Sequence, residues 1–462
     1  MKFSSQWRKG IGVLVAVCYV SGCASTFANR TASYNPVVLE RPKTELAEEE
    51  LLGVRVKPFE PGEIPKEKKK KERARGLSGE IRKAEGYYSA VQLRNAMQQS
   101  GYWGPVRVVP DAVTGGEVVI TGKILESDGE IIKLEISVQD ATGRVWFEKE
   151  YEQVIDIARY GLLGDGDEPF QYLYNRIAND VAEFRQNMSP KDVKSVRQVA
   201  ELKFAEEFAP DAFKGYLVNG DPKTQSSSIE SEEPQPSETS PVFKVARLPA
   251  DDDEMLGRIR RIRVREEALV DTLDLQFERL SREMGVEYTQ WRNARLNEMN
   301  AVREVEKKRN ERVSRAVALT VLGALAGVGM AAAGGSSGAA IGGVMAGSAT
   351  VVGATMAMEA SRQAKADMEI HQVALEELGN SLTEDLKVTV VEIEGETVEL
   401  RGTAEAKFKQ WREMLNEIHK REVGELDPFV PSEGQSADPS ESESAESTPA
   451  PPAQSEMETE QL

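Results

Sequence analysis

Residues 118–138 read VVITGKILESDGEIIKLEISV, and this stretch decides the fold of the first half of the chain. Apolar side chains alternate with polar ones on both sides of Asp128-Gly129, a dipeptide typical of two-residue hairpin turns. The alternation is cleanest from Ile132 to Val138. The stretch therefore predicts two antiparallel strands that bury one face against a core.

The segments around this hairpin predict the rest of an α+β module over residues 77–218. Its helices are indicated by apolar residues at spacings of three and four, and Ser189-Pro190 is a typical helix start. We expect a meander of strands with helices on one face. The expected elements are a helix ending at Ser100-Gly101, strands at 106–110 and at Val145-Trp146-Phe147, and helices over 170–184 and 189–216.

Residues 117–124, followed by a hairpin and a later helix, resemble the small periplasmic domains of several envelope lipoproteins. Examples are the outer-membrane activators of peptidoglycan synthases and the amino-terminal domain of the Tol-system propeller protein. The resemblance covers roughly residues 87–187 and rests on pattern, not on a diagnostic motif. It implies a protein-docking domain without catalysis.

Residues 1–22 have the pattern of a secretory signal peptide. Three cations precede an apolar run that is too short to span a bilayer permanently. The run ends at Val20-Ser21-Gly22-Cys23, which resembles the lipobox of bacterial lipoproteins. That resemblance implies acylation of Cys23, palmitate included, and by the family's sorting rule Ala24-Ser25 favours the outer membrane, with the protein facing the periplasm. The alternative is an ordinary signal peptide with an incidental cysteine.

Three segments lack the apolar content that folding needs. Residues 23–76 are rich in Pro, Glu and Lys and are expected to form a lipidated flexible tether. A Ser/Glu/Pro-rich stretch at 219–245 predicts a disordered linker that separates two domains. Residues 422–462 are expected to be a disordered acidic tail.

The composition argues against several classes of function. The formal net charge is −19, and about −22 without the signal peptide, so no nucleic-acid partner is expected. The two histidines, His371 and His419, have no second metal-ligand pattern near them. An acidic turn at 164–168 lacks the remaining ligands of a calcium loop. We therefore expect no metal, no cofactor and no enzyme activity.

A long charged helix is expected over residues 246–315. Apolar residues recur there at spacings of three or four, which is the geometry of a seam on one helix face, as in a coiled coil. They are Leu269, Leu273, Phe277, Leu280, Met284, Tyr288 and Trp291. The seam drifts after Trp291 and Gly285 weakens the helix, so an uninterrupted coiled coil is left open.

Residues 316–358 carry no ionisable side chain and predict a helical hairpin around Gly334-Gly335-Ser336-Ser337-Gly338. Each arm is long enough to cross a hydrocarbon core, and the spacing of small residues resembles the glycine-zipper hairpins of envelope proteins. The glycines expected at a membrane or oligomer interface are Gly323, Gly327, Gly334, Gly338, Gly343 and Gly347. Two interpretations stay open: a hairpin that enters a membrane or oligomerises there, and a soluble hairpin packed on its flanking helices.

Residues 359–421 predict a helix, a β-hairpin that turns at Glu394-Gly395-Glu396, and an amphipathic helix. The stripe of the last helix is expected to pack onto the hairpin or onto the long helix. Its members are Ala404, Phe408, Trp411, Leu415 and Ile418.

Together these patterns indicate a non-catalytic cell-envelope lipoprotein that scaffolds or stabilises an assembly. The expected partners are the membrane, through the lipid on Cys23 and through residues 316–358, other envelope proteins, and further copies of the chain. The alternative is a subunit of a transport or secretion complex whose glycine-zipper hairpins oligomerise in the membrane. A periplasmic enzyme is the least favoured, because the usual catalytic constellations are lacking.

Overall fold

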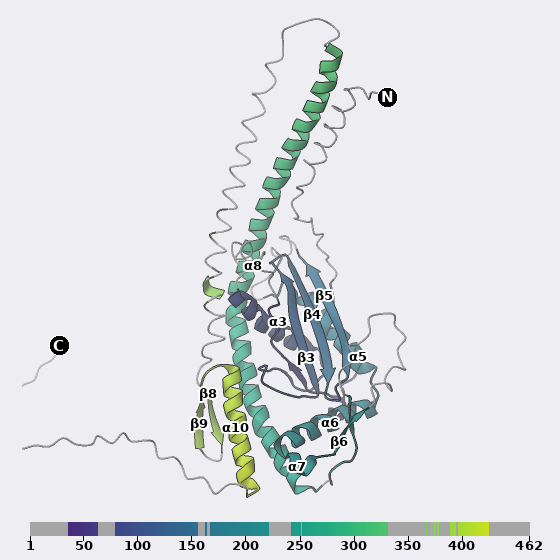
Figure 1. Ribbon diagram of the computed structural model, residues 1–462, viewed down its shortest axis with the longest axis vertical. Helices are drawn as coiled ribbons and strands as arrows, with labels where there is room; N and C mark the ends of the chain where they lie inside the picture. Colours follow the sequence, from purple (N-terminus) through teal and green to yellow (C-terminus); the bar gives the residue numbers. More distant parts are fainter. Residues whose placement is uncertain are drawn as a thin grey trace, which may run out of the picture. The chain divides into compact units, whose positions relative to one another are not determined.

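The N-terminal region of the computed structural model is built on a mixed sheet of five strands in the order β2-β1-β3-β4-β5 (Figure 1). These strands are β1 (Val54–Val56), β2 (Val106–Val108), β3 (Val118–Ser127), β4 (Ile131–Asp140) and β5 (Val145–Val154). β1 runs parallel to β2 and β3, whereas β3, β4 and β5 form an antiparallel meander. The hairpin expected around Asp128-Gly129 is therefore confirmed, and Gly129 has the positive φ that such turns use.

The main helices occur in the expected order, but the long helix begins at Glu254 and not at residue 246, and a hairpin that the sequence did not predict joins residues 217–220 to 242–245. The helices are η1 (Glu48–Glu50), α3 (Gly79–Ser100), α5 (Gln171–Gln186), α6 (Pro190–Phe208), α7 (Pro210–Phe213), α8 (Glu254–Met330) and α10 (Ala404–Glu422). Two hairpins complete the fold, β6 (Leu217–Gly220) with β7 (Val242–Val245), and β8 (Thr389–Ile393) with β9 (Glu396–Leu400). The structure describes residues 36–62, 79–155, 162–163, 167–220, 242–250, 252–330, 362, 366, 371, 373–375, 377, 389–393 and 396–424.

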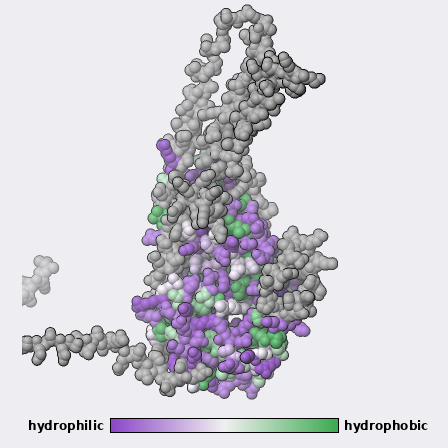
Figure 2. Space-filling model, viewed as in Figure 1, coloured by the Kyte–Doolittle hydropathy of each residue, from purple (hydrophilic) through white to green (hydrophobic). Residues whose placement is uncertain are grey.

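One face of the sheet lies against helices and the other is more open. Alternate residues of β3 and β4 are buried, and α3 and α5 contact each other and the sheet. The opposite face carries polar side chains such as Thr121, Lys123 and Glu135. The predicted α+β architecture is thus confirmed. On the side shown in Figure 2 the described surface is mainly hydrophilic, with small apolar patches between charged residues.

The prediction of a flexible tether over residues 23–76 is wrong for part of that range. β1 is fully buried and lies between β2 and β3, so it is an inner strand of the sheet. Phe59 is also buried, and a side chain at Gly122 would overlap its ring. A strand of three residues that is covered on both faces shows no alternation, which is why the pattern missed it.

The prediction of a disordered linker over 219–245 is also wrong at the two ends that the structure describes, residues 219–220 and 242–245. β7 pairs with β6, and the Phe243 amide donates a hydrogen bond of 2.6 Å to the Thr142 carbonyl. Residues 221–241 lie outside the described residues. The acidic tail falls outside them from residue 425 onward.

α8 is a continuous helix of 77 residues, about 115 Å long at 1.5 Å per residue. Six of the seven expected seam residues are buried and Leu280 is partly buried, but they pack against the α+β module. Tyr87 of α3, for example, lies 5.3 Å from Phe277, between ring centroids. The seam thus covers the module, and its part from Met284 to Trp291 shares a buried cluster with Leu375, a helical residue that follows in the chain. Gly285 does not interrupt the helix.

The C-terminal hairpin and amphipathic helix form as expected, and Figure 1 shows α10 alongside α8. Trp411 Nε1 donates to the Arg265 carbonyl at 3.2 Å, and Gln276 donates to Thr389 of β8 at 3.0 Å. One hydrophobic core cluster contains residues of the sheet, α6, α8 and α10. The predicted domain boundary at 219–245 therefore does not separate two cores, and the described residues up to His419 belong to one compact unit.

Candidate functional site: buried charges between the sheet and the long helix

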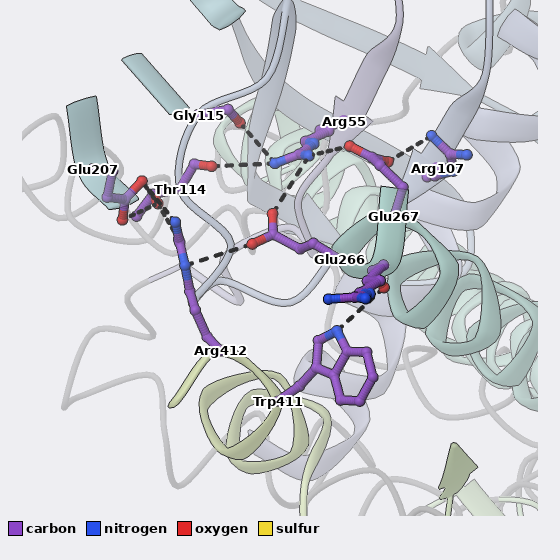
Figure 3. Close-up of polar contacts among 10 residues, drawn as sticks. Arg55, Arg107, Thr114, Gly115, Glu207, Glu266, Glu267, Trp411 and Arg412 are labelled. Carbon is purple, nitrogen blue, oxygen red and sulfur yellow. Dashed lines mark hydrogen bonds and ion pairs between the residues drawn. The ribbon is translucent and has the colours of Figure 1, made fainter. Parts of the chain in front are cut away.

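Arg55 of β1 is the centre of a charge network where the sheet meets α8 (Figure 3). It is flanked by two buried valines and is itself only 7% exposed. Its guanidinium donates to the Thr114 and Gly115 carbonyls at 3.1 and 3.4 Å, and to Glu267 at 2.6 Å. Gly116 makes this close approach feasible, because a Cβ there would lie 2.9 Å from Arg55 Cδ.

Glu266 and Glu267 are consecutive residues of α8 that face these arginines. Glu267 accepts hydrogen bonds from Arg55 and, at 2.8 Å, from Arg107 of β2. Glu266 is 1% exposed and lies 3.5 Å from Arg412 Nε and 3.9 Å from Arg55 Nη2. Neither carboxylate oxygen of Glu266 has a hydrogen-bond partner within the described part of the chain. Its charge is therefore stabilised by longer-range attraction alone.

Burial and charge act on these two carboxyl groups with different net results. Burial raises the pKa of Glu266, and the lowering effect of Arg412 and Arg55 does not outweigh it. Burial also raises the pKa of Glu267, but here Arg55 and Arg107 outweigh it, so the pKa lies below its usual value.

Arg412 extends the network from α10 to α6. It lies 2.8 Å from Glu207 of α6, and it donates to Thr114 Oγ1 at 3.0 Å. Thr114 in turn donates to Glu207. The network thus joins β1, the loop after β2, and helices α6, α8 and α10. Buried ion pairs contribute little net stability but are costly to break, so they favour one register of packed elements.

A second buried cluster joins α3, α8 and the start of α5. The Arg292 side chain is fully buried, pairs with Glu168 at 2.9 Å and lies 3.7 Å from the ring centroid of Tyr288. Glu168 also accepts hydrogen bonds from Tyr88 Oη at 2.6 Å and from the Phe170 amide at 3.0 Å. Glu168, part of the acidic turn considered for calcium, therefore serves a structural role. No metal-binding group of side chains occurs among the described residues.

Further charged pairs continue along α8. Arg107 pairs with Asp271, and Asp274 accepts from the Val108 amide at 2.8 Å. Arg303 donates to both oxygens of Glu130, at 2.7 and 2.5 Å. Contacts of this kind therefore hold α8 against the module from Glu266 to Arg303, and the helix itself continues to Met330.

The interface residues predicted from sequence are not brought together in the described part of the chain. Gly323 and Gly327 lie in α8, as the first arm of the expected hairpin requires. Cys23, Gly334, Gly338, Gly343 and Gly347 lie outside the described residues. None of the described helices is both long and apolar enough to cross a membrane.

Sequence reasoning did not identify the charge network. A usable signal was present, because Arg55 interrupts the apolar run Leu51-Leu52-Gly53-Val54-Arg55-Val56. An arginine in such a run needs a partner when the run is buried. The partners Glu266 and Glu267 could not be found in the same way, because they stand in a helix that is rich in charge.

Comparison with known proteins adds no relative. No protein-family model matches the chain, no curated protein is similar to it, and no solved structure matches its fold. The resemblances to lipoproteins and to glycine-zipper hairpins therefore rest on the residues alone.

Proposed function

We propose that this protein is a non-catalytic cell-envelope lipoprotein that scaffolds or stabilises an envelope assembly. The observation that carries the proposal is the series of buried charged pairs that fixes α8 on the α+β module from Glu266 to Arg303. A helix held in one register can present its remaining length in a defined direction. That remaining length leads into the charge-free segment at 316–358.

The anchor in this proposal is a lipid on Cys23, in the outer membrane and facing the periplasm. It is supported by the cationic and apolar run before Val20-Ser21-Gly22-Cys23. Several acyl chains would retain the protein without a spanning helix, since each buried CH₂ contributes about 0.8 kcal/mol. The partners would be envelope proteins and further copies of the chain, with no nucleic acid.

A second candidate is a subunit of a transport or secretion complex whose glycine-zipper hairpins oligomerise in the membrane. It is favoured by one observation, that α8 continues as helix through Gly323 and Gly327. Glycines four apart on a helix allow close approach of a second helix.

A crosslinking pull-down from intact cells tests the scaffold proposal. Wild type is compared with a chain that lacks residues 316–358 and with a control that lacks residues 430–460 of the acidic tail. Loss of crosslinked envelope proteins only on the first deletion is the expected result. Identical partners in all three chains would contradict a scaffold that works through the end of α8.

Two further variants distinguish the candidates. Cys23→Ser should release the protein from membranes if the lipid is the anchor. Gly327→Leu should abolish a detergent-resistant oligomer, and with it conductance across lipid bilayers, only if the transport alternative is correct. The transport alternative would be excluded if the wild-type protein gave neither a detergent-resistant oligomer nor conductance across lipid bilayers.

A further inference from the structure

A cavity of about 540 Å³ opens beside Arg55 on the less covered face of the sheet. Its floor is formed by Val119 and Thr121 of β3 and its walls by the loop after β2, helices α6 and α8, and strand β7. This volume lies within the range of about 300–1,000 Å³ that is typical of small-molecule sites. The charged pairs around Arg55 hold the walls in place, so the cavity is pre-formed.

The cavity has a local excess of positive charge in a protein with a net charge of −19. Its acids, Asp140 and Glu207, are already paired with Arg144 at 3.1 Å and Arg412 at 2.8 Å. Lys57, Lys203 and Arg263 also line it, and none of the three has an ion pair within the described parts of the chain. Lys57, Lys203 and Arg263 attract Asp111, Asp140 and Glu267, respectively, only at longer range. An anion that entered could therefore come closer to these cations than their present acidic neighbours do.

Two of these cations are held by aromatic rings. Lys203 Nζ lies 3.8 Å from the ring centroid of Phe243, and the Arg263 guanidinium lies 5.7 Å from that of Phe204. Burial lowers the pKa of Lys203, and the opposing effect of Asp140 is smaller. The Lys203 ammonium has thus lost part of its hydration without gaining a carboxylate at ion-pair distance. A bound anion would stabilise this charge in place of the missing water.

We propose that this cavity binds a small organic anion with an apolar body, such as a carboxylate, with the charged group near Lys203 and Arg263 and the apolar part against Phe204 and Phe243. The inference is independent of the proposed scaffold function. The apolar lining sets it apart from a site for an inorganic ion, which would need only polar partners.

The probe is octanoate, a carboxylate with an apolar chain, titrated into the full mature protein by isothermal titration calorimetry. Its uncharged counterpart, 1-octanol, tests whether the charge is recognised. Octanoate is expected to bind at least about tenfold more tightly than octanol, because a charge-assisted pair adds to the apolar contact. No heat of binding at about 1 mM octanoate, or equal affinity for octanol, would overturn the proposal.

Lys203→Met keeps the length of the side chain and removes its charge, and it should weaken octanoate binding by about tenfold. The matched control is Lys194→Met, because Lys194 lies exposed on the same helix and does not line the cavity. If Lys203→Met fails to fold, Arg263→Gln is used in its place, because it also removes a positive charge from the lining of the cavity. Unchanged affinity in the folded variant would show that the cavity does not recognise the anion.

Discussion

At the scale of single residues, Glu266 and Glu267 show how neighbouring carboxylates can contribute oppositely to stability. The pKa of Glu267 is lowered because Arg55 and Arg107 outweigh burial, so its charge stabilises the fold above the unfolded value near 4.5. The pKa of Glu266 is raised mainly by burial, so its charge opposes folding once the pH exceeds that unfolded value. The ionised forms of these two neighbouring side chains therefore contribute with opposite sign to the free energy of folding.

We expect Glu267→Gln to destabilise the protein more than Glu266→Gln at pH 7. The first variant removes a carboxylate that two arginines bind, at a cost of about 1–3 kcal/mol. The second removes a charge that folding disfavours, so its cost is smaller. Urea unfolding at pH 7 and at about pH 4 measures both variants. The difference should narrow at the lower pH, because below the unfolded value of 4.5 the unfolded chain binds a proton at Glu267 more readily than the folded protein does. The prediction would be contradicted if Glu266→Gln lowered the free energy of unfolding more than Glu267→Gln did. It would also be contradicted if the difference between the two variants did not change with pH.

Arg292 offers a sharper case, because its side chain is fully buried. Arg292→Met should cost about 3–5 kcal/mol, since it leaves the Glu168 carboxylate buried without its counter-ion. Glu168→Gln in the same chain should recover part of that loss. A double-mutant cycle by denaturant unfolding measures the coupling, and simple additivity of the two substitutions would rule out the pair as a coupled unit.

At the scale of elements, α3 lies against the segment that follows β1. The Phe59 amide donates to the Gly86 carbonyl at 3.1 Å, and a Cβ at Gly86 would lie 2.1 Å from the Phe59 carbonyl oxygen. That oxygen belongs to the backbone and cannot move alone. The helix can therefore dock at this distance only with glycine at position 86.

Gly86→Ala should consequently lower the free energy of unfolding by about 1–3 kcal/mol, the usual cost of overpacking. Gly257→Ala is the matched control, because Gly257 lies in α8 and a Cβ there would have no other atom within 4 Å. The control should gain up to about 1 kcal/mol, since alanine favours a helix interior over glycine. Thermal or urea unfolding compares the two. Equal effects would mean that residues 57–60 do not pack on α3 as described.

The periodic elements of this fold could be predicted from sequence, whereas their partners could not. β3, β4, α5 and α10 have long apolar patterns that match their buried faces, and each was expected. β1 was missed because a short strand buried on both faces has no period to detect. The seam of α8 was visible, but a seam does not say whether it meets a second helix or a sheet. The charge network depends on that pairing, so it could be found only in three dimensions.

At the scale of the whole molecule, the halves of the chain on either side of residues 221–241 share one core. Arg55, Arg94 and Arg107 from the first half pair with acidic residues of α8 in the second half. Apolar residues from both halves belong to one buried cluster. The chain connection at 221–241 is therefore not what holds the halves together.

Cleavage at a protease site inserted between residues 226 and 238 should leave two fragments that elute together on size exclusion. The reason is that the buried apolar area and the ion pairs link the fragments without the covalent connection. They should separate only in denaturant, because non-covalent burial of this kind is lost when the fold is lost. A matched site inserted between residues 430 and 445 serves as the control and should release its C-terminal peptide, since the acidic sequence there has too few apolar residues to pack. Separation of the two large fragments in native buffer would mean that α8 forms a domain independent of the sheet, and the charged pairs along it would then be surface contacts.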